Sequence, residues 1–254
     1  AQVTNPPIDS LRETSVMSLE TCLGVERNLF EESSLHAGRL VLNSPVLSKQ
    51  VFEKITSLHQ KDFKKDCLSL HYDSNIDLEE AINTICDRAV RSVKKGTVLI
   101  VLSDSDMNDK QMTIPAIMAV GAVHHKLIDQ GLRCDCNIIV ETASAWNSHH
   151  FAVLLGYGAS AIYPYLAYEV IHDMILRNSL NKKIYPSHVN NYIKGINKGL
   201  LKIMSKMGIS CVSSYRGAQL FEIIGINTNV INLCFKNNVS RIEGASFDDI
   251  EDDL

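Results

Sequence analysis

The sequence lacks the features that mark membrane-spanning, secreted and nucleic-acid-binding proteins. No apolar run reaches the ~20 residues that a membrane-spanning helix needs, and the first residues form no charged-then-apolar leader. Lys and Arg number 25 against 29 for Asp and Glu, so no basic excess is available for nucleic acid. The seven cysteines are scattered, without the ligand spacing of a zinc site, which favours free thiols in a reducing compartment. We therefore expect a cytoplasmic protein.

From about residue 65 onward, short apolar runs alternate with segments of helical periodicity, which is typical of a parallel sheet covered by helices. Strands are predicted at residues 66–72, 97–102, 138–140 and 160–163, with helices between them at 77–95, 115–131 and 147–155. The run TVLIVL at 97–102 is apolar throughout, which favours a strand buried on both faces. The pattern predicts an α/β fold with one parallel sheet, flanked by helices and connected by right-handed crossovers.

The two ends of the chain differ from this middle part. Beyond residue 163, helices are predicted at 166–178, 188–207, 214–224 and 229–235, which makes the C-terminal part mostly helical. Residues 5–7 (NPP) must be extended, because proline disfavours helix in the residue before it. Ser44-Pro45 predicts the start of a helix that runs to Leu58. We expect residues 1–60 to be a leading segment and residues 61–254 to form the α/β domain.

Polar side chains follow two of the predicted strands. Asp104 and Asp106 come after the strand at 97–102, and Glu141 ends the strand at 138–140. Ligand sites in parallel sheets gather at the carboxyl ends of the strands, so Asp104, Glu141 and His149 could share a pocket. Alternatively, these carboxylates cap helices or contact a neighbouring domain, together with His149 and His150. We favour the second interpretation.

Two pairs of adjacent histidines, His124-His125 and His149-His150, resemble metal ligands. Neighbours on a helix point about 100° apart, so neither pair can easily chelate one ion without partners from elsewhere, and we expect structural histidines. The Cys134-x-Cys136 pair is interpreted as two small buried apolar side chains. No metal site is therefore predicted.

The glycines of the C-terminal half lack the strand-then-loop setting of a phosphate cradle. We therefore expect the chain to bind no FMN. Lys202, Lys206 and Arg216 are basic, but a solvated helix face or a domain contact explains them as well as a phosphate does.

Three blocks of sequence carry a resemblance to a known family: KGLLKIMSKMGISCVSSYRGAQLFEIIG at 198–225, IVETASAWNSHHFAVLLGYGASAIYPYLAYEV at 139–170, and AQVTNPPIDSLRE at 1–13. They resemble the central domain of the glutamate synthase large (alpha) subunit, and the residues of the second block are typical of bacterial NADPH-dependent enzymes. The resemblance runs in order from the first residue to the ASFDDIEDD tail. It implies an α/β domain related to a degenerate (β/α)₈ barrel, which holds two catalytic domains in register.

The same resemblance implies a parent enzyme that makes two L-glutamate from L-glutamine and 2-oxoglutarate with NADPH. Its glutaminase and FMN-binding domains would flank this chain in the same subunit. FMN and an iron-sulfur cluster would belong to the parent subunit outside this chain, and NADPH and FAD to a small partner subunit. The chain itself would hold no cofactor and no complete active site.

Thr4 and Asn5 are the residues to which the resemblance gives a role. The family passes ammonia from the glutaminase to the flavin site through a protected channel, and these two residues are implied to line its mouth. Extended backbone with two short polar side chains offers hydrogen bonds to ammonia without charge. The alternative is an ordinary linker held extended by the prolines.

The sequence departs from the family at two loops. The family usually has Ser-Asp-Arg where this chain has Ser103-Asp104-Ser105, and Ala-Arg-Asp-Pro-His-His where it has Ala-Trp-Asn-Ser-His-His at 145–150. Two arginines are thus replaced, by Ser105 and Trp146, which puts any anion contact there in doubt. A rival function also stays open, a self-contained α/β hydrolase or metal-dependent enzyme using Asp104, Glu141 and His149. It requires those three side chains to converge in one pocket.

Overall fold

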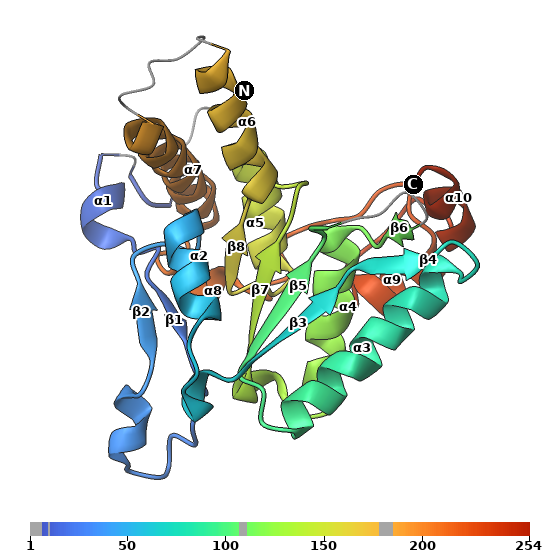
Figure 1. Cartoon of the computed structure of the whole chain (residues 1–254), viewed down its shortest axis with the longest axis horizontal. Helices are drawn as coiled ribbons and strands as arrows, with labels where there is room; N and C mark the ends of the chain where they lie inside the picture. Colours follow the sequence, from blue (N-terminus) through green and yellow to red (C-terminus); the bar gives the residue numbers. More distant parts are fainter. Residues whose placement is uncertain (1–6, 10, 107–110, 178–184) are drawn as a thin grey trace.

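The computed structural model describes residues 7–9, 11–106, 111–177 and 185–254. Its centre is a four-stranded parallel sheet (Figure 1). In spatial order the strands are β3 (Lys65–Ser69), β5 (Leu99–Ser103), β7 (Asn137–Glu141) and β8 (Ala161–Tyr163). Each new strand is added on the same side of the previous one, which is the winding of a (β/α) barrel. The predicted parallel sheet flanked by helices is confirmed.

Three helices cover one face of this sheet: α3 (Leu78–Lys94), α4 (Ala116–Asp129) and α5 (Ser148–Gly156). Ile100, Leu102, Ile138 and Val140 point into the larger core cluster on this side. Alternate residues of the same strands face the opposite side. The strands are buried on both faces, so their sequences are apolar throughout rather than alternating.

The opposite face is covered by the leading segment and by α6 (Tyr165–Leu176). The leading segment contributes β1 (Thr21–Leu23), β2 (Leu40–Leu42) and α2 (Lys49–Thr56). The ring of Phe52 stacks on Tyr163 of β8 with 4.4 Å between ring centroids. The predicted boundary near residue 60 stays a prediction, and residues before and after it share this second core cluster.

The helix predicted to open at Ser44-Pro45 begins later. Its N-cap is Ser48, whose hydroxyl accepts the N–H of Val51 at 3.3 Å. The residues before it run beside β8 instead: Ile162 donates its N–H to the Pro45 carbonyl, and Leu47 donates to the Ile162 carbonyl, each at 2.8 Å. Pairing with a buried strand therefore overrides the local helix-start signal.

The strand predicted at residues 66–72 is divided. After β3 the chain leaves the sheet, and β4 (His71–Asp73) pairs antiparallel with β6 (Gln111–Thr113). Leu70 lies at the division, donating its N–H to the Ser103 carbonyl and accepting one from Ile114. Residues 66–72 were predicted as one strand because their sequence gives no sign that the pairing partner changes from β5 to β6.

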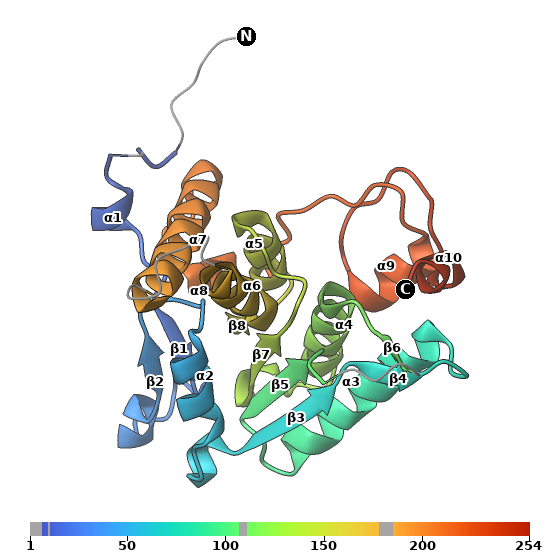
Figure 2. The same cartoon turned by 45° about the horizontal axis from the view of Figure 1, so that its top comes forward.

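The C-terminal part is mostly helical, with α7 (Tyr185–Met207), α8 (Val212–Tyr215), α9 (Thr228–Cys234) and α10 (Phe247–Asp252). Figure 2 shows the chain crossing from α8 to α9 and α10, which pack beside α4 and α3. The helix predicted at 214–224 is wrong. Gly217 and Gln219 have positive φ (67° and 54°), which ends the helix, and Phe221 then stacks on Tyr157 from a loop.

The remaining short elements are α1 (Glu13–Val16) and the 3₁₀ turns η1 (Ser34–Ala37), η2 (Lys61–Phe63) and η3 (Arg133–Asp135). No helix among the described residues is long and apolar enough to cross a membrane.

Candidate functional site

The carboxyl edge of the sheet brings the ends of β5 and β7 together. Ser103 lies opposite Glu141 in the register, and its hydroxyl donates to Glu141 Oε2 at 2.7 Å. The Asp104 N–H donates to the Glu141 carbonyl at 3.1 Å. Burial raises the pKa of Glu141, hydrogen bonds from Ser103 and Ser105 oppose the rise, and nearby Asp106 and Asp104 add to it. The two carboxylates are thus neighbours, each engaged by different partners.

The Asp104 carboxylate fastens the loop that follows β7. Its Oδ1 accepts the Ala143 N–H at 2.9 Å, and its Oδ2 accepts the Thr142 hydroxyl. The Tyr165 hydroxyl donates to the Asp104 carbonyl at 3.1 Å. With both carboxylate oxygens committed, the side chain has a structural role in the loop.

His149 and His150 open α5, as predicted. Asn147 caps this helix, because its Oδ1 accepts the N–H groups of His149 (2.9 Å) and His150 (3.3 Å). The Nδ1 atom of His150 accepts the Trp146 N–H at 3.2 Å, whereas the His149 side chain is exposed. Trp146 is 52% exposed.

A cleft of about 480 Å³ lies at this edge and contains Asp104, His149 and His150 among its lining residues. Most of the remaining lining is apolar: Ile114, Pro115, Ala116, Ile117, Val153, Leu154 and Leu254. Glu141 does not line the cleft, so the three side chains that the rival function needs do not converge there. Within the described residues, no group of three or more His, Cys, Asp or Glu side chains could hold a metal ion. A self-contained hydrolase or metal enzyme is therefore not supported.

The other sequence-predicted residues have mixed outcomes. Thr4 and Asn5 lie outside the described residues. Cys136 is buried as predicted, but Cys134 is exposed, because it belongs to the surface turn η3. The Lys202 side chain is 45% exposed, and its Nζ also lies 3.0 Å from Oε1 of the buried Glu13, which ties α7 to α1.

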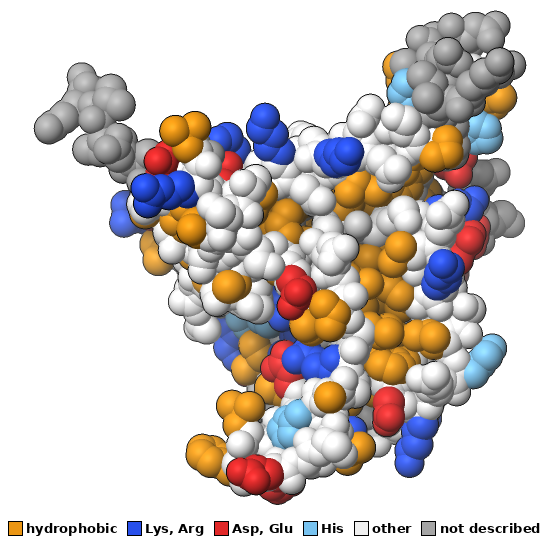
Figure 3. All heavy atoms as spheres, turned by 90° about the vertical axis from the view of Figure 1, so that its left-hand side faces the viewer, with side chains coloured by type: hydrophobic (Ala, Val, Ile, Leu, Met, Phe, Trp, Pro, Cys, Tyr) orange, Lys and Arg blue, Asp and Glu red, His pale blue; other side chains and the backbone are white. Residues whose placement is uncertain are grey.

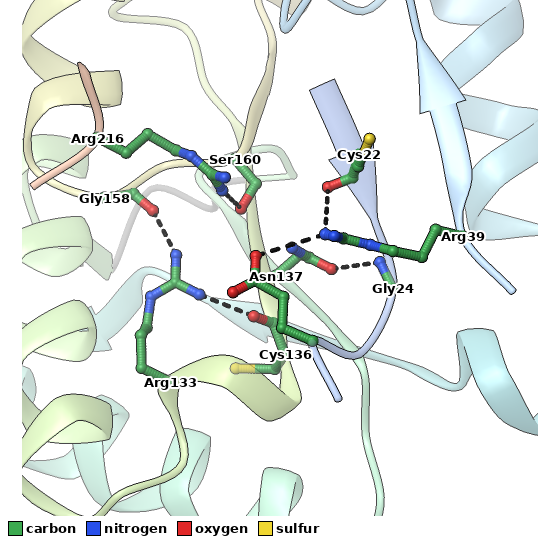
Figure 4. Close-up of polar contacts among 10 residues, drawn as sticks. Cys22, Gly24, Arg39, Arg133, Cys136, Asn137, Gly158, Ser160 and Arg216 are labelled. Carbon is green, nitrogen blue, oxygen red and sulfur yellow. Dashed lines mark hydrogen bonds and ion pairs between the residues drawn. The ribbon is translucent and has the colours of Figure 1, made fainter. Parts of the chain in front are cut away.

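Arg133 is the centre of a polar network at the amino edge of the sheet (Figure 4). It donates to the carbonyls of Cys136 (2.7 Å) and Gly158 (2.9 Å), and its Nε donates to His124 Nδ1 at 2.9 Å. Burial, together with the Arg133 charge, lowers the pKa of His124 to about 3. His124 is thus a neutral structural acceptor in the core, in agreement with the structural interpretation of that pair.

Two further arginines reach the same edge from distant segments (Figure 4). Arg216 donates to the Ser160 hydroxyl at 3.1 Å, and Arg39 donates to the Cys22 carbonyl at 3.3 Å. Glu26 lies 3.5 Å from Arg39. The sequence analysis missed this cluster and left Arg216 open between a solvated helix face, a domain contact and a phosphate contact, because three arginines from unconnected segments leave no local motif.

The helix α6 presents an apolar surface that the described residues leave largely uncovered. Of its twelve residues only Tyr168 and Ile175 are buried, whereas Val170, Met174 and Leu176 are 40%, 42% and 59% exposed. Figure 3 shows hydrophobic side chains gathering on one face of the molecule, where α2, α6 and α7 contribute partly buried apolar residues. Contiguous exposed apolar surface of this kind typically marks a protein contact.

The family model described as "Glutamate synthase central domain" matches residues 1–227. The chain is 41% identical to the glutamate synthase [NADPH] large chain of Bacillus subtilis, over 100% of this chain and 16% of that protein. It is 43% identical to ferredoxin-dependent glutamate synthase 1 of Arabidopsis thaliana, over 98% of this chain and 16% of that protein. Among solved structures, inosine 5′-monophosphate dehydrogenase from Legionella pneumophila aligns with a TM-score of 0.37 at 12% identity, covering 67% of this chain and 68% of that one.

The chain thus spans about a sixth of the length of these two relatives. The sequence identity exceeds 40% over essentially the whole chain, and the family model matches as well. These two findings assign the chain to a family without any argument from similarity of fold. The chain belongs to the glutamate synthase central domain family.

Proposed function

We propose that this chain is the connecting central domain of a glutamate synthase large subunit. The parent enzyme would make two L-glutamate from L-glutamine and 2-oxoglutarate with reducing equivalents from NADPH. The observation that carries the proposal is the alignment of the whole chain with 16% of the NADPH-dependent large chain of Bacillus subtilis. In this proposal the segment would belong to a much longer polypeptide, and the activity is assigned to that whole polypeptide.

The geometry of the carboxyl edge supports a connecting role. Asp104 holds a loop, Glu141 is bonded to Ser103, and His149 faces a mainly apolar cleft. None of the three forms the nucleophile–base or acid–base pair that catalysis at a strand edge requires. We assign Asp104, Glu141, His149 and His150 to a domain interface. That the chain binds no FMN, iron-sulfur cluster or other cofactor remains a prediction.

The partners in this proposal are the glutaminase and FMN-binding domains of the same subunit and the small subunit, which would carry NADPH and FAD. FMN and an iron-sulfur cluster would sit in the large subunit outside this chain. The apolar surface of α6 is the surface we assign to a domain contact, since Val170 and Met174 would be desolvated there. Residues 1–60 would lead from the glutaminase domain, and Thr4 and Asn5 would line the mouth of the ammonia channel. The enzyme would be cytoplasmic.

The test is a charge placed on α6 in the intact enzyme. Val170→Asp should impair glutamine-dependent glutamate formation while the glutaminase reaction and flavin reduction, measured separately, persist, because only the docking of domains is disturbed. Val239→Asp, at a 53% exposed valine in the loop after α9, is the matched control. If Val170→Asp formed glutamate from glutamine at the normal rate and released no free ammonia, the assignment of α6 to the domain contact would be wrong.

A further inference from the structure

A cavity of about 290 Å³ opens beside the arginine cluster at the amino edge of the sheet. Arg27, His36 and Arg39 line it together with a single carboxylate, Glu26. We propose that this cavity binds a small, doubly charged oxyanion, held by the Arg39 guanidinium. The site lies at the opposite edge of the sheet from Asp104 and His149, and the proposal is independent of the connecting role.

The charges at this edge are unbalanced. Arg39, Arg133 and Arg216 bring three guanidinium groups close enough to influence one another: after burial, the Arg133 charge contributes most to lowering the pKa of Arg216, and Arg39 lowers it further. Glu26 is the carboxylate that offsets them, and it is itself 48% exposed. Buried cations without a counter-charge are costly, so an anion beside these arginines would be stabilised.

The hydrogen bonds of Arg39 are also incomplete. Its Nη2 makes two long contacts, 3.3 Å to the Cys22 carbonyl and 3.5 Å to Glu26 Oε1. Its Nε is buried and has no partner among the described residues. Arg39 lines the cavity, and its Nη2 is only weakly engaged, which suits an oxyanion because the planar guanidinium fork pairs with two oxygens at once.

The cavity wall is built on fixed backbone. The Gly24 N–H donates to Asn137 Oδ1 at 2.6 Å, and the Glu26 N–H donates to the Cys134 carbonyl at 2.9 Å. Both bonds fasten the segment carrying Glu26 to the β7 side of the sheet. Because this segment is held, the anion would meet a preformed wall rather than a loop that must order on binding.

Two kinds of anion share the required chemistry, inorganic phosphate and a short dicarboxylate. Each carries about two negative charges near neutral pH and is far smaller than the cavity of about 290 Å³. The Glu26 carboxylate competes with either of them for Arg39. Removing its charge should therefore strengthen binding, and removing the Arg39 charge should weaken it.

The experiment uses the intact enzyme in chloride-free buffer, with phosphate and succinate as separate probes in calorimetric titrations. We expect saturable binding of at least one probe, weakened about tenfold or more by Arg39→Gln and tightened about fivefold by Glu26→Gln. Hydrogen exchange with the same probe should slow in peptides covering residues 22–39 and 133–137. Arg241→Gln is the matched control, because Arg241 is exposed and only 3.7 Å from Glu222 in a distant loop.

Glu26→Gln keeps the proposal testable if Arg39→Gln fails to fold, since Glu26 is half exposed. Binding of phosphate alone or succinate alone identifies the anion class and supports the site. No saturable binding in the wild-type enzyme and in Glu26→Gln would overturn it, as would equal affinities in the wild type and both variants.

Discussion

Asn137 Oδ1 accepts the Gly24 N–H at 2.6 Å, and both residues are buried. Asn137 opens β7 and Gly24 follows β1, so this bond fastens the leading segment to the amino edge of the sheet. Gly24 has φ of 137°, and a Cβ there would lie 3.2 Å from the Arg39 Cγ atom. The chain can make this turn only with glycine, which fixes the path of the residues that follow.

Replacing the acceptor should destabilise the chain. Asn137→Ala leaves the Gly24 N–H buried without a partner, and we expect a loss of about 1–3 kcal/mol in the free energy of unfolding, measured in urea. Asn229→Ala, at an exposed position on α9, should change it by no more than about 0.5 kcal/mol. Equal effects of the two substitutions would contradict the role assigned to the buried bond.

Gly199 should be intolerant of a methyl group because α7 meets α5 there. A Cβ at Gly199 would overlap Oγ and Cβ of Ser148. Gly199→Ala should therefore separate the helices and lower the free energy of unfolding by about 1–3 kcal/mol.

Gly195 provides the control, one turn earlier on the same helix. A Cβ at Gly195 meets nothing within 4 Å, so Gly195→Ala should stabilise the chain by about 0.5–1 kcal/mol through helix propensity alone. Chemical denaturation of the two variants would show shifts of opposite sign. A stabilising effect of both would disprove the close packing of α5 on α7.

The neutral state of His124 predicts a pH dependence of stability. Burial holds its pKa at about 3, below the ordinary 6.5, so the unfolded chain takes up a proton that the folded chain refuses. Its contribution is complete above pH 6.5 and is lost progressively as the pH falls from 6.5 towards 3. In His124→Gln, which keeps an acceptor for Arg133, the unfolding free energy should fall less between pH 7 and pH 5. An unchanged slope would show that His124 titrates normally.

The parallel sheet was predictable because its determinants are local. TVLIVL, followed by a polar turn, indicates a strand buried on both faces, and Asn147 caps the helix that it was predicted to cap. The predictions fail where contacts between distant segments determine the local structure. Pro45 and Leu47 bond to β8 although their sequence favours a helix start, and residues after Gly217 form a loop that lays Phe221 on Tyr157.

The candidate site was likewise predictable only in part. Strand order places Asp104, Glu141 and His149 at one edge, which the sequence predicted, but it cannot decide which side chains turn into the cleft. That choice is made by hydrogen bonds such as Ser103 to Glu141. The arginine cluster was unpredictable, since Arg39, Arg133 and Arg216 become neighbours only when the leading and C-terminal segments fold onto the sheet.

The most direct test of the connecting role is the fate of ammonia in the intact enzyme carrying Asn5→Trp. If Thr4 and Asn5 line the channel mouth, the bulky indole should obstruct passage, and the prolines at 6 and 7 limit how far the segment can move aside. Glutaminase activity and flavin reduction should survive, while glutamate formed per glutamine hydrolysed falls and free ammonia appears in solution. Stoichiometric, leak-free glutamate formation at the normal rate would contradict the account and leave Thr4 and Asn5 as a linker.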